Sequence, residues 1–245
     1  MQKVLSQDRP KHSDANVATE LPLRAISQRA AYVSFGAAAF FLVLLAVLHV
    51  VKPEFEPSWR FVSEYAIGRH GWIMVLAFMS LAVSCTALVP AIRSQIETTG
   101  GRIGLILLLV VAVSLIVAGI FVADPITAGQ DQLTTHGNLH GLAASVGIPG
   151  LPIAALLISR SLSRNPAWSA ARLIVRLTAH LTWISVLLMS VSMFVLLNKS
   201  QGKFGPDVLI GWPNRLVVLS YCAWLMVVSW HSSRLSLKSS RDVRA

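Results

Sequence analysis

The chain has 245 residues, of which 54% are hydrophobic and only 13% are charged. Soluble domains usually carry about 25% charged residues, so this composition argues against a soluble globular protein and predicts a membrane protein. The net charge of +10 would suit nucleic-acid binding. The distribution of the basic residues explains that charge by membrane orientation instead, and no nucleic-acid partner is expected.

The first 29 residues are polar and include Pro10 and Pro22. They contain no short apolar core followed by a cleavage site, so no cleavable signal peptide is predicted. We interpret residues 1–29 as a cytoplasmic polar N-terminal tail.

Apolar stretches without Asp, Glu, Lys or Arg then follow one another along the chain. The first five are close to the roughly 20 residues needed to cross about 30 Å of hydrocarbon. Strands of a membrane barrel would alternate in polarity, and these stretches do not. The sequence therefore predicts an all-α fold, a bundle of six transmembrane helices over residues 30–231, and a cytoplasmic basic C-terminal tail over residues 232–245. The six stretches are 30–50, 71–92, 103–123, 141–159, 177–197 and 216–230.

Six spans place both ends of the chain on the same side of the membrane. The two tails, with the connections 93–102 and 160–176, hold 15 of the 21 Lys and Arg residues and 5 of the 11 acidic ones. The whole net charge therefore lies on this side, and the positive-inside rule predicts that both termini are cytoplasmic. Anionic membrane lipids are the expected partners of the basic tails, with a protein partner as the alternative.

The connection after the first span reads "WRFVSEYAIGRHGW". Its aromatic residues, Tyr65 among them, are typical of a segment at the membrane interface. One interpretation is an ordinary amphipathic loop with surface charges. The other is that Ser63 and Glu64 point into a polar pocket between the helix ends.

The connection after the third span contains "FVADP" and "THGNLHG". Asp124 precedes a proline, which excludes helix there and ends the span. If the fourth helix begins near Thr135, His136 and His140 share one of its faces, turned inward toward Asp124. Neutral imidazoles at a helix N-terminus can bind metal, so His136, His140 and Asp124 are a candidate zinc site. A hydrogen-bonded cluster without metal is the preferred interpretation.

Two later features concern the shape of the bundle. "GIPGLP" places two prolines in the fourth helix, which predicts a kink that either opens a cavity or is filled by neighbouring helices. The sixth stretch, 216–230, is only about 22 Å long as a helix. Its helix must begin earlier, with Pro213 in the first turn. Arg215 then lies near the membrane surface and either snorkels outward or pairs with Glu64 or Asp124.

Four stretches together resemble a known family. "WRFVSEYAIGRHGWIMVLAF", "FVADP", "HGNLH" and "GWPNR" are similar to the bacterial multi-pass membrane family catalogued as domain of unknown function 998. The resemblance covers approximately residues 30–232. It implies a six-helix protein of the bacterial inner (plasma) membrane, and it implies no known activity.

A second resemblance concerns only the types of residue that could form a site. Membrane hydrolases related to alkaline ceramidases surround a zinc ion with a serine, an aspartate and three histidines. That family has seven spans and carries its histidine pair late in the chain, so order and helix count differ here. The residues of this chain that would take those parts are Ser63, Asp124, His136 and His140, with His49 or His70 as the third histidine.

The sequence thus predicts an outward-facing polar pocket that binds or moves a lipid or small amphiphile. A metal-dependent hydrolase or transferase at the outer leaflet is one alternative, with Arg215 holding an anionic headgroup, and a non-catalytic membrane subunit is another. No acid or base lies at the middle of a span, which argues against ion-coupled transport. The predicted pocket residues are Ser63, Glu64, Asp124, His136, His140 and Arg215.

Overall fold

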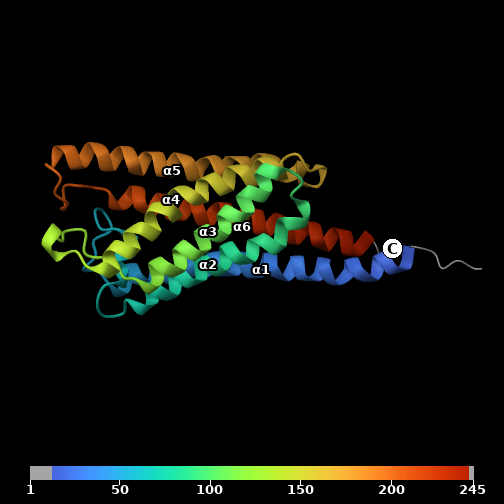
Figure 1. Cartoon of the computed structure of the whole chain (residues 1–245), viewed down its shortest axis with the longest axis horizontal. Helices are drawn as coiled ribbons and strands as arrows, with labels where there is room; N and C mark the ends of the chain where they lie inside the picture. Colours follow the sequence, from blue (N-terminus) through green and yellow to red (C-terminus); the bar gives the residue numbers. More distant parts are fainter. Residues whose placement is uncertain (1–12, 243–245) are drawn as a thin grey trace, which may run out of the picture.

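The structure is a computed structural model that describes the backbone of residues 13–242 and the side chains of residues 27–235. Within that part of the chain there is no strand, and six helices are long and apolar enough to cross a membrane. The predicted all-α bundle of six transmembrane helices is confirmed (Figure 1). The helices are α1 (Ser13–Val51), α2 (Trp72–Ile92), α3 (Thr99–Ile120), α4 (Thr135–Leu162), α5 (Arg172–Lys199) and α6 (Gly211–Asp242).

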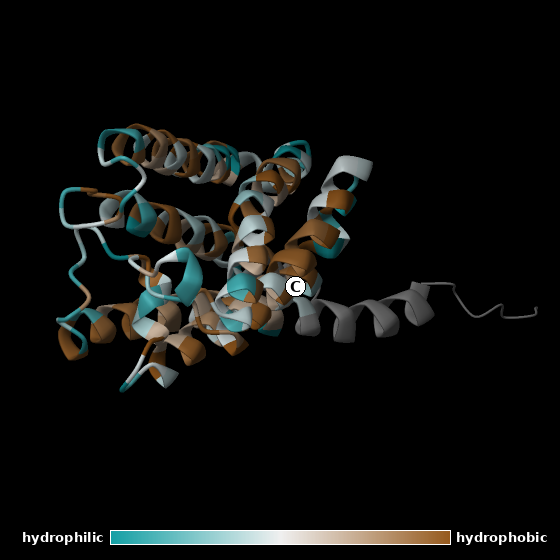
Figure 2. Cartoon of the chain, turned by 60° about the vertical axis from the view of Figure 1, so that its left-hand side comes forward, coloured by the Kyte–Doolittle hydropathy of each residue, from teal (hydrophilic) through white to brown (hydrophobic). Residues whose placement is uncertain are grey.

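The helices form an elongated bundle with two different ends. The connections 52–71, 121–134 and 200–210 gather at one end, at the left of Figure 1, which we call the loop end. The start of α1, the end of α6 and the two shorter connections lie toward the opposite end. Hydrophobic residues run along the helices, and hydrophilic residues gather in the connections (Figure 2).

Small hydroxyl side chains join the helices inside the bundle. Ser229 of α6 donates a hydrogen bond to the Ser34 hydroxyl of α1 over 2.7 Å. Ser84 of α2 donates to the Ser34 carbonyl oxygen over 2.8 Å. Such residues allow close helix approach and supply interhelical hydrogen bonds in lipid, where apolar burial gives little preference for helix pairing. They connect the three helices without any buried charge.

The two prolines of α4 lie in a continuous helix. Pro152 has no N–H, so it leaves the carbonyl oxygen of Ile148 without its helical partner. The Tyr221 hydroxyl of α6 donates a hydrogen bond to that oxygen. A neighbouring helix thus satisfies the backbone group that the proline frees, as membrane helices require.

Helix ends differ from the apolar stretches in informative ways. α1 begins at Ser13, inside the stretch expected to be a polar tail, and α6 continues to Asp242, into the expected C-terminal tail. The rest of both tails, residues 1–12 and 243–245, lies outside the described residues. α6 begins at Gly211, before its apolar stretch, which confirms that prediction. α3 ends at Ile120, so Asp124 lies in an extended connection and does not itself end the helix.

Candidate functional site: a two-part cavity at the loop end

A buried glutamate fixes the connection between α1 and α2. Glu64 lies in a short 3-10 turn, Val62–Ala66, and is only 1% exposed. Its carboxylate accepts hydrogen bonds from the backbone N–H groups of Phe61 and Ile126, each over 2.9 Å, and pairs with the Arg60 guanidinium at 3.2 Å. Burial raises the pKa of Glu64, and these three contacts oppose that shift. Glu64 therefore ties this turn to the connection between α3 and α4.

A buried arginine fixes the same turn from the opposite side. Arg215 in the second turn of α6 is 5% exposed. Its Nε donates to His49 Nε2 over 2.9 Å, and one Nη donates to the Tyr65 hydroxyl over 3.0 Å. The other Nη donates to the carbonyl oxygens of Arg60 and Gly211, over 2.8 and 3.1 Å. One side chain thus joins α1, α6 and the turn between α1 and α2.

Both arrangements predicted for the Arg215 side chain, snorkelling outward and pairing with an acid, are wrong. The side chain is buried and does not snorkel, and within the described residues it forms no ion pair with Glu64 or Asp124. Its delocalised charge is held by neutral acceptors and by the Tyr65 ring, whose centroid lies 5.7 Å from the guanidinium carbon. His49 can accept from arginine only through an unprotonated Nε2, so its proton lies on Nδ1, which donates to a carbonyl oxygen one turn earlier in α1.

The first turn of α6 explains the stretch "GWPNR". A Cβ at Gly211 would lie 2.2 Å from the carbonyl oxygen of Pro57, so only glycine allows this approach. The Gly211 N–H donates to the carbonyl oxygen of Ser58 over 2.9 Å. The Asn214 side-chain oxygen accepts from the Val62 N–H over 2.9 Å. The start of α6 is therefore built against the connection that follows α1.

Asp124 anchors Thr134, the residue that caps the N-terminus of α4. Its two carboxylate oxygens accept from the N–H and the hydroxyl of Thr134, each over 2.8 Å. The Thr134 hydroxyl in turn accepts from the Gly137 N–H over 3.0 Å, which completes a helix cap. A Cβ at position 137 would lie 2.0 Å from the carboxylate, so Asp124 could keep these hydrogen bonds only beside a glycine or after shifting. The hydrogen bonds from Thr134 hold the pKa of Asp124 below its usual range.

The two histidines of α4 face the end of α3, and both rings contact Phe121. His140 is 7% exposed, and its Nδ1 lies 2.9 Å from the carbonyl oxygens of Ala118 and of Phe121. Two carbonyl acceptors require a proton on Nδ1, so Nε2 of the neutral ring carries a lone pair. His136 is exposed, and its ring packs edge-on against Phe121.

The described residues contain no group of three or more His, Cys, Asp or Glu side chains placed to hold a metal ion. The structure therefore does not assemble the zinc site that the spacing of His136, His140 and Asp124 suggested. Both oxygens of Asp124 are occupied by the helix cap, and His140 Nδ1 is occupied by the end of α3.

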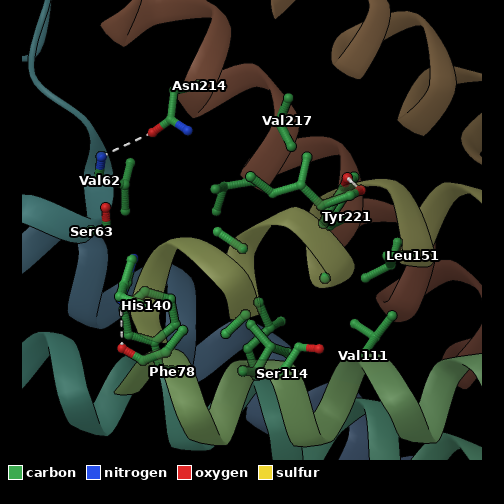
Figure 3. A pocket seen from close by; sticks show the side chains of 18 of the residues that line it. Val62, Ser63, Phe78, Val111, Ser114, His140, Leu151, Asn214, Val217 and Tyr221 are labelled. Carbon is green, nitrogen blue, oxygen red and sulfur yellow. Dashed lines mark hydrogen bonds between the residues drawn. The ribbon is translucent and has the colours of Figure 1, made fainter. Parts of the chain in front are cut away.

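Two adjoining cavities open between these anchored segments, and Figure 3 shows side chains that line the deeper one. The deep cavity, of about 120 Å³, lies among the helices and is lined mainly by apolar side chains. The wide cavity, of about 940 Å³, lies at the loop end between the connection 121–134, α4, α5 and the start of α6. The residues that line both cavities are Ser63, His140, Ala144, Ile148 and Asn214.

The structure brings together part of the predicted pocket. Ser63, Glu64, Asp124 and His140 line the wide cavity, and Ser63 and His140 also line the deep one. The other two predicted residues, His136 and Arg215, line neither cavity. Asn214, the third polar residue at the junction, was not among the predicted pocket residues.

Two buried residues at the loop end were not recognised from sequence. Tyr65, predicted to lie at the interface, is fully buried beneath Arg215. Lys52 is also fully buried, and its ammonium donates to the carbonyl oxygens of Tyr65, over 3.0 Å, and of Ile67. Burial lowers the pKa of Lys52. A lysine directly after an apolar stretch equally suits a lipid headgroup, so the sequence held no signal for this role.

A family model described as "Protein of unknown function (DUF998)" matches residues 35–231. The chain belongs to the DUF998 family. This confirms the resemblance seen in the four sequence stretches. No curated protein and no solved structure matches the chain. In this DUF998 protein, the connection between α1 and α2 and the starts of α4 and α6, which carry much of that resemblance, all contribute residues to the wide cavity.

Proposed function

We propose that this DUF998 protein binds or moves a lipid or small amphiphile, held in the two cavities at the loop end. The hydrocarbon chain occupies the deep cavity, and the polar group lies at the junction formed by Ser63, His140 and Asn214. The observation that carries the proposal is the shared lining, because five residues line both an apolar inner cavity and a wider, more polar outer one. Mostly apolar walls with a few convergent polar groups are typical of ligand sites.

The polar groups at the junction indicate the class of headgroup. Serine, asparagine and a neutral histidine suit hydroxyl, ester or amide groups. The buried cations Arg215 and Lys52 and the partly buried Arg60 are engaged within the protein and line neither cavity, so Arg215 does not hold an anionic headgroup. The basic residue that lines the wide cavity is Lys203, which is exposed at its rim. We therefore propose an amphiphile whose headgroup is uncharged where it meets the junction.

The distribution of basic residues supports an orientation with the loop end outside the cytoplasm. Cysteine placed at Gln130, at the loop end, should react with an impermeant thiol reagent in intact cells. Cysteine placed at Ser169, at the opposite end, should react only after the membrane is opened. Both native cysteines are buried, so background labelling should be low. Labelling of position 169 from outside would reverse the orientation.

Lipid retention tests the binding proposal. Ala144 of α4 lines both cavities, and the next residue, Ser145, is exposed. Ala144→Phe should fill the junction, whereas Ser145→Phe adds a similar volume on the outer face of the same helix. The full chain would be purified in a synthetic detergent, and the retained lipid per protein would be extracted and quantified by mass spectrometry.

We expect the wild-type protein and Ser145→Phe to retain a lipid that Ala144→Phe loses by about tenfold, which corresponds to ~1.4 kcal/mol of binding free energy. The thermal unfolding midpoint of each variant controls for misfolding. Equal retention by the two variants would show that the bound lipid lies elsewhere, and the proposal would then fail.

A further inference from the structure

We infer that Ser63 and His140 form a nucleophile and base pair that hydrolyses a carboxylic ester in the bound amphiphile. The inference rests on the proposed binding site and adds a reaction to it. It rests on a serine and a histidine that are held rigidly, are engaged with no other described group through Oγ and Nε2, and line the same two cavities. It also requires the bound ester to bring Ser63 Oγ within hydrogen-bond reach of His140 Nε2, because no hydrogen bond joins these two atoms in the described part of the chain. The loop end anchors both side chains and leaves Ser63 Oγ and His140 Nε2 uncommitted.

Ser63 is held in place by its neighbours. On one side, the Val62 N–H donates to Asn214 of α6 over 2.9 Å. On the other, Glu64 accepts from the Ile126 N–H over 2.9 Å and is buried. Within the described residues the Ser63 hydroxyl has no hydrogen-bond partner, although it lines both cavities. A small turn fastened on both sides therefore presents one uncommitted hydroxyl to the ligand space.

His140 is the matching base. The carbonyl oxygens of Ala118 and Phe121 hold its Nδ1 proton, each at 2.9 Å, and so fix the tautomer and the ring plane. An acid plays this orienting part in the familiar serine triad, and two carbonyls at the end of α3 play it here. Nε2 has no partner among the described residues, and the ring lines both cavities. Figure 3 shows His140 and Ser63 at the same end of the deep cavity, on different elements.

The junction also supplies a hydrogen-bond donor for a carbonyl oxygen. The side-chain N–H₂ of Asn214 contacts the Met189 sulfur at 3.7 Å, which is a weak acceptor. A carbonyl oxygen that carries developing negative charge would be a stronger partner for this amide. Because the chain lies in the deep cavity and the headgroup in the wide one, an ester between them falls at the junction.

The reaction balances without a cofactor. The Ser63 Oγ bonds to the acyl carbon while its proton passes to His140 Nε2. The bond from that carbon to the alcohol oxygen breaks, and the alcohol takes the proton from His140. Water from the wide cavity then gives a proton to Nε2 and bonds to the acyl carbon. The serine oxygen leaves and recovers its proton from His140, so one ester and one water give one acid and one alcohol.

An alkyl fluorophosphonate tests this directly, because it forms a covalent adduct with activated serines and resembles an ester with a hydrocarbon chain. The full chain in detergent would be treated with the probe, and the modified residue would be identified by peptide mass spectrometry. We expect an adduct on Ser63 that is absent in Ser63→Ala and forms at least tenfold more slowly in His140→Gln. Ser145→Ala should label like the wild-type protein.

Two outcomes would overturn the inference: no adduct on Ser63 in the wild-type protein, or an unchanged labelling rate in His140→Gln. The first does not depend on any variant folding. Lipid retention separates this inference from the proposed function. Retained lipid without an adduct rejects the reaction and leaves binding standing. An adduct on Ser63 without retained lipid rejects stable binding and leaves the nucleophile standing.

Discussion

Replacement of Arg215 by lysine keeps the positive charge and removes the planar guanidinium group. This fork of N–H donors holds the loop end together. Four hydrogen bonds depend on that fork, and their acceptors surround it on three sides. A lysine ammonium is a single point and can take over one side, where the carbonyl oxygens of Arg60 and Gly211 lie. The bonds to His49 Nε2 and to the Tyr65 hydroxyl should then be lost.

The expected cost follows from those two bonds. Hydrogen bonds to charged groups contribute about 1.5–3 kcal/mol each in proteins, which gives roughly 3–6 kcal/mol for Arg215→Lys. Interhelical hydrogen bonds measured within membranes average only about 0.6 kcal/mol, which sets a floor near 1 kcal/mol. We expect a loss of about 3 kcal/mol, because the Arg215 side chain is buried and its partners come from three segments.

The free energy of unfolding would be measured in mixed micelles, following tryptophan fluorescence as a denaturing detergent is added. Arg69→Lys is the matched control, because Arg69 is an exposed arginine at the same end. It should change the unfolding free energy by less than about 0.5 kcal/mol. If Arg215→Lys is as stable as Arg69→Lys, the fork does not hold the loop end together and the account of this anchor is wrong.

Three further predictions use the same unfolding measurement. Gly211→Ala should lower the free energy of unfolding by about 1–3 kcal/mol, because its Cβ would lie 2.2 Å from a backbone oxygen. Gly205→Ala should leave it unchanged, because a Cβ there meets nothing within 4 Å. Equal effects of the two variants would refute the close approach at Gly211. Tyr221→Phe should cost about 1–3 kcal/mol by leaving the carbonyl oxygen freed by Pro152 unpaired, and an unchanged stability would contradict that pairing. Because the pKa of Asp124 is lowered in the folded protein, its contribution to the free energy of unfolding is present above about pH 4 and is lost as the pH falls through the folded-state pKa. Asp124→Asn should remove this loss of stability at acid pH. If the loss persists in the variant, another group causes it.

Local rules predicted the helices and some of their ends. The start of α4 was expected near Thr135, and the helix begins there, with Thr134 as its N-cap. The start of α6 follows from length, because 216–230 is too short to span and Pro213 suits a first turn. These signals lie within a few residues of the feature they predict, so a single sequence is enough to find them.

The partners of the buried groups could not be predicted in this way. Arg215 pairs with His49, 166 positions away in the chain, and the sequence suggested acids because they are the usual partners of arginine. Asp124 also looked like a ligand, and its partner proved to be Thr134, which is close in sequence and completes a helix cap. Residue type and side of the membrane narrow the choice, but only the packing of α1 against α6 selects the partner.

The site itself was predicted in part for the same reason. His140 was singled out by its spacing from His136, and Ser63 by its place beside Glu64. Their position on a shared cavity depends on where α3 ends and on how the turn at residues 62–66 is anchored. Neither feature is encoded by the residues next to them, so the sequence indicated the chemistry and the fold supplied the arrangement.

The most direct test of the central claim is to locate the hydrocarbon chain of a bound lipid. A lipid ester carrying a photoactivatable diazirine in its acyl chain would be added to the purified protein, illuminated, and its attachment sites mapped by mass spectrometry. On α3, we expect attachment at Val111 and Leu115, which line the deep cavity. Attachment confined to Ile106 and Val113, which are 63% and 59% exposed on the outer face of the same helix, would contradict it.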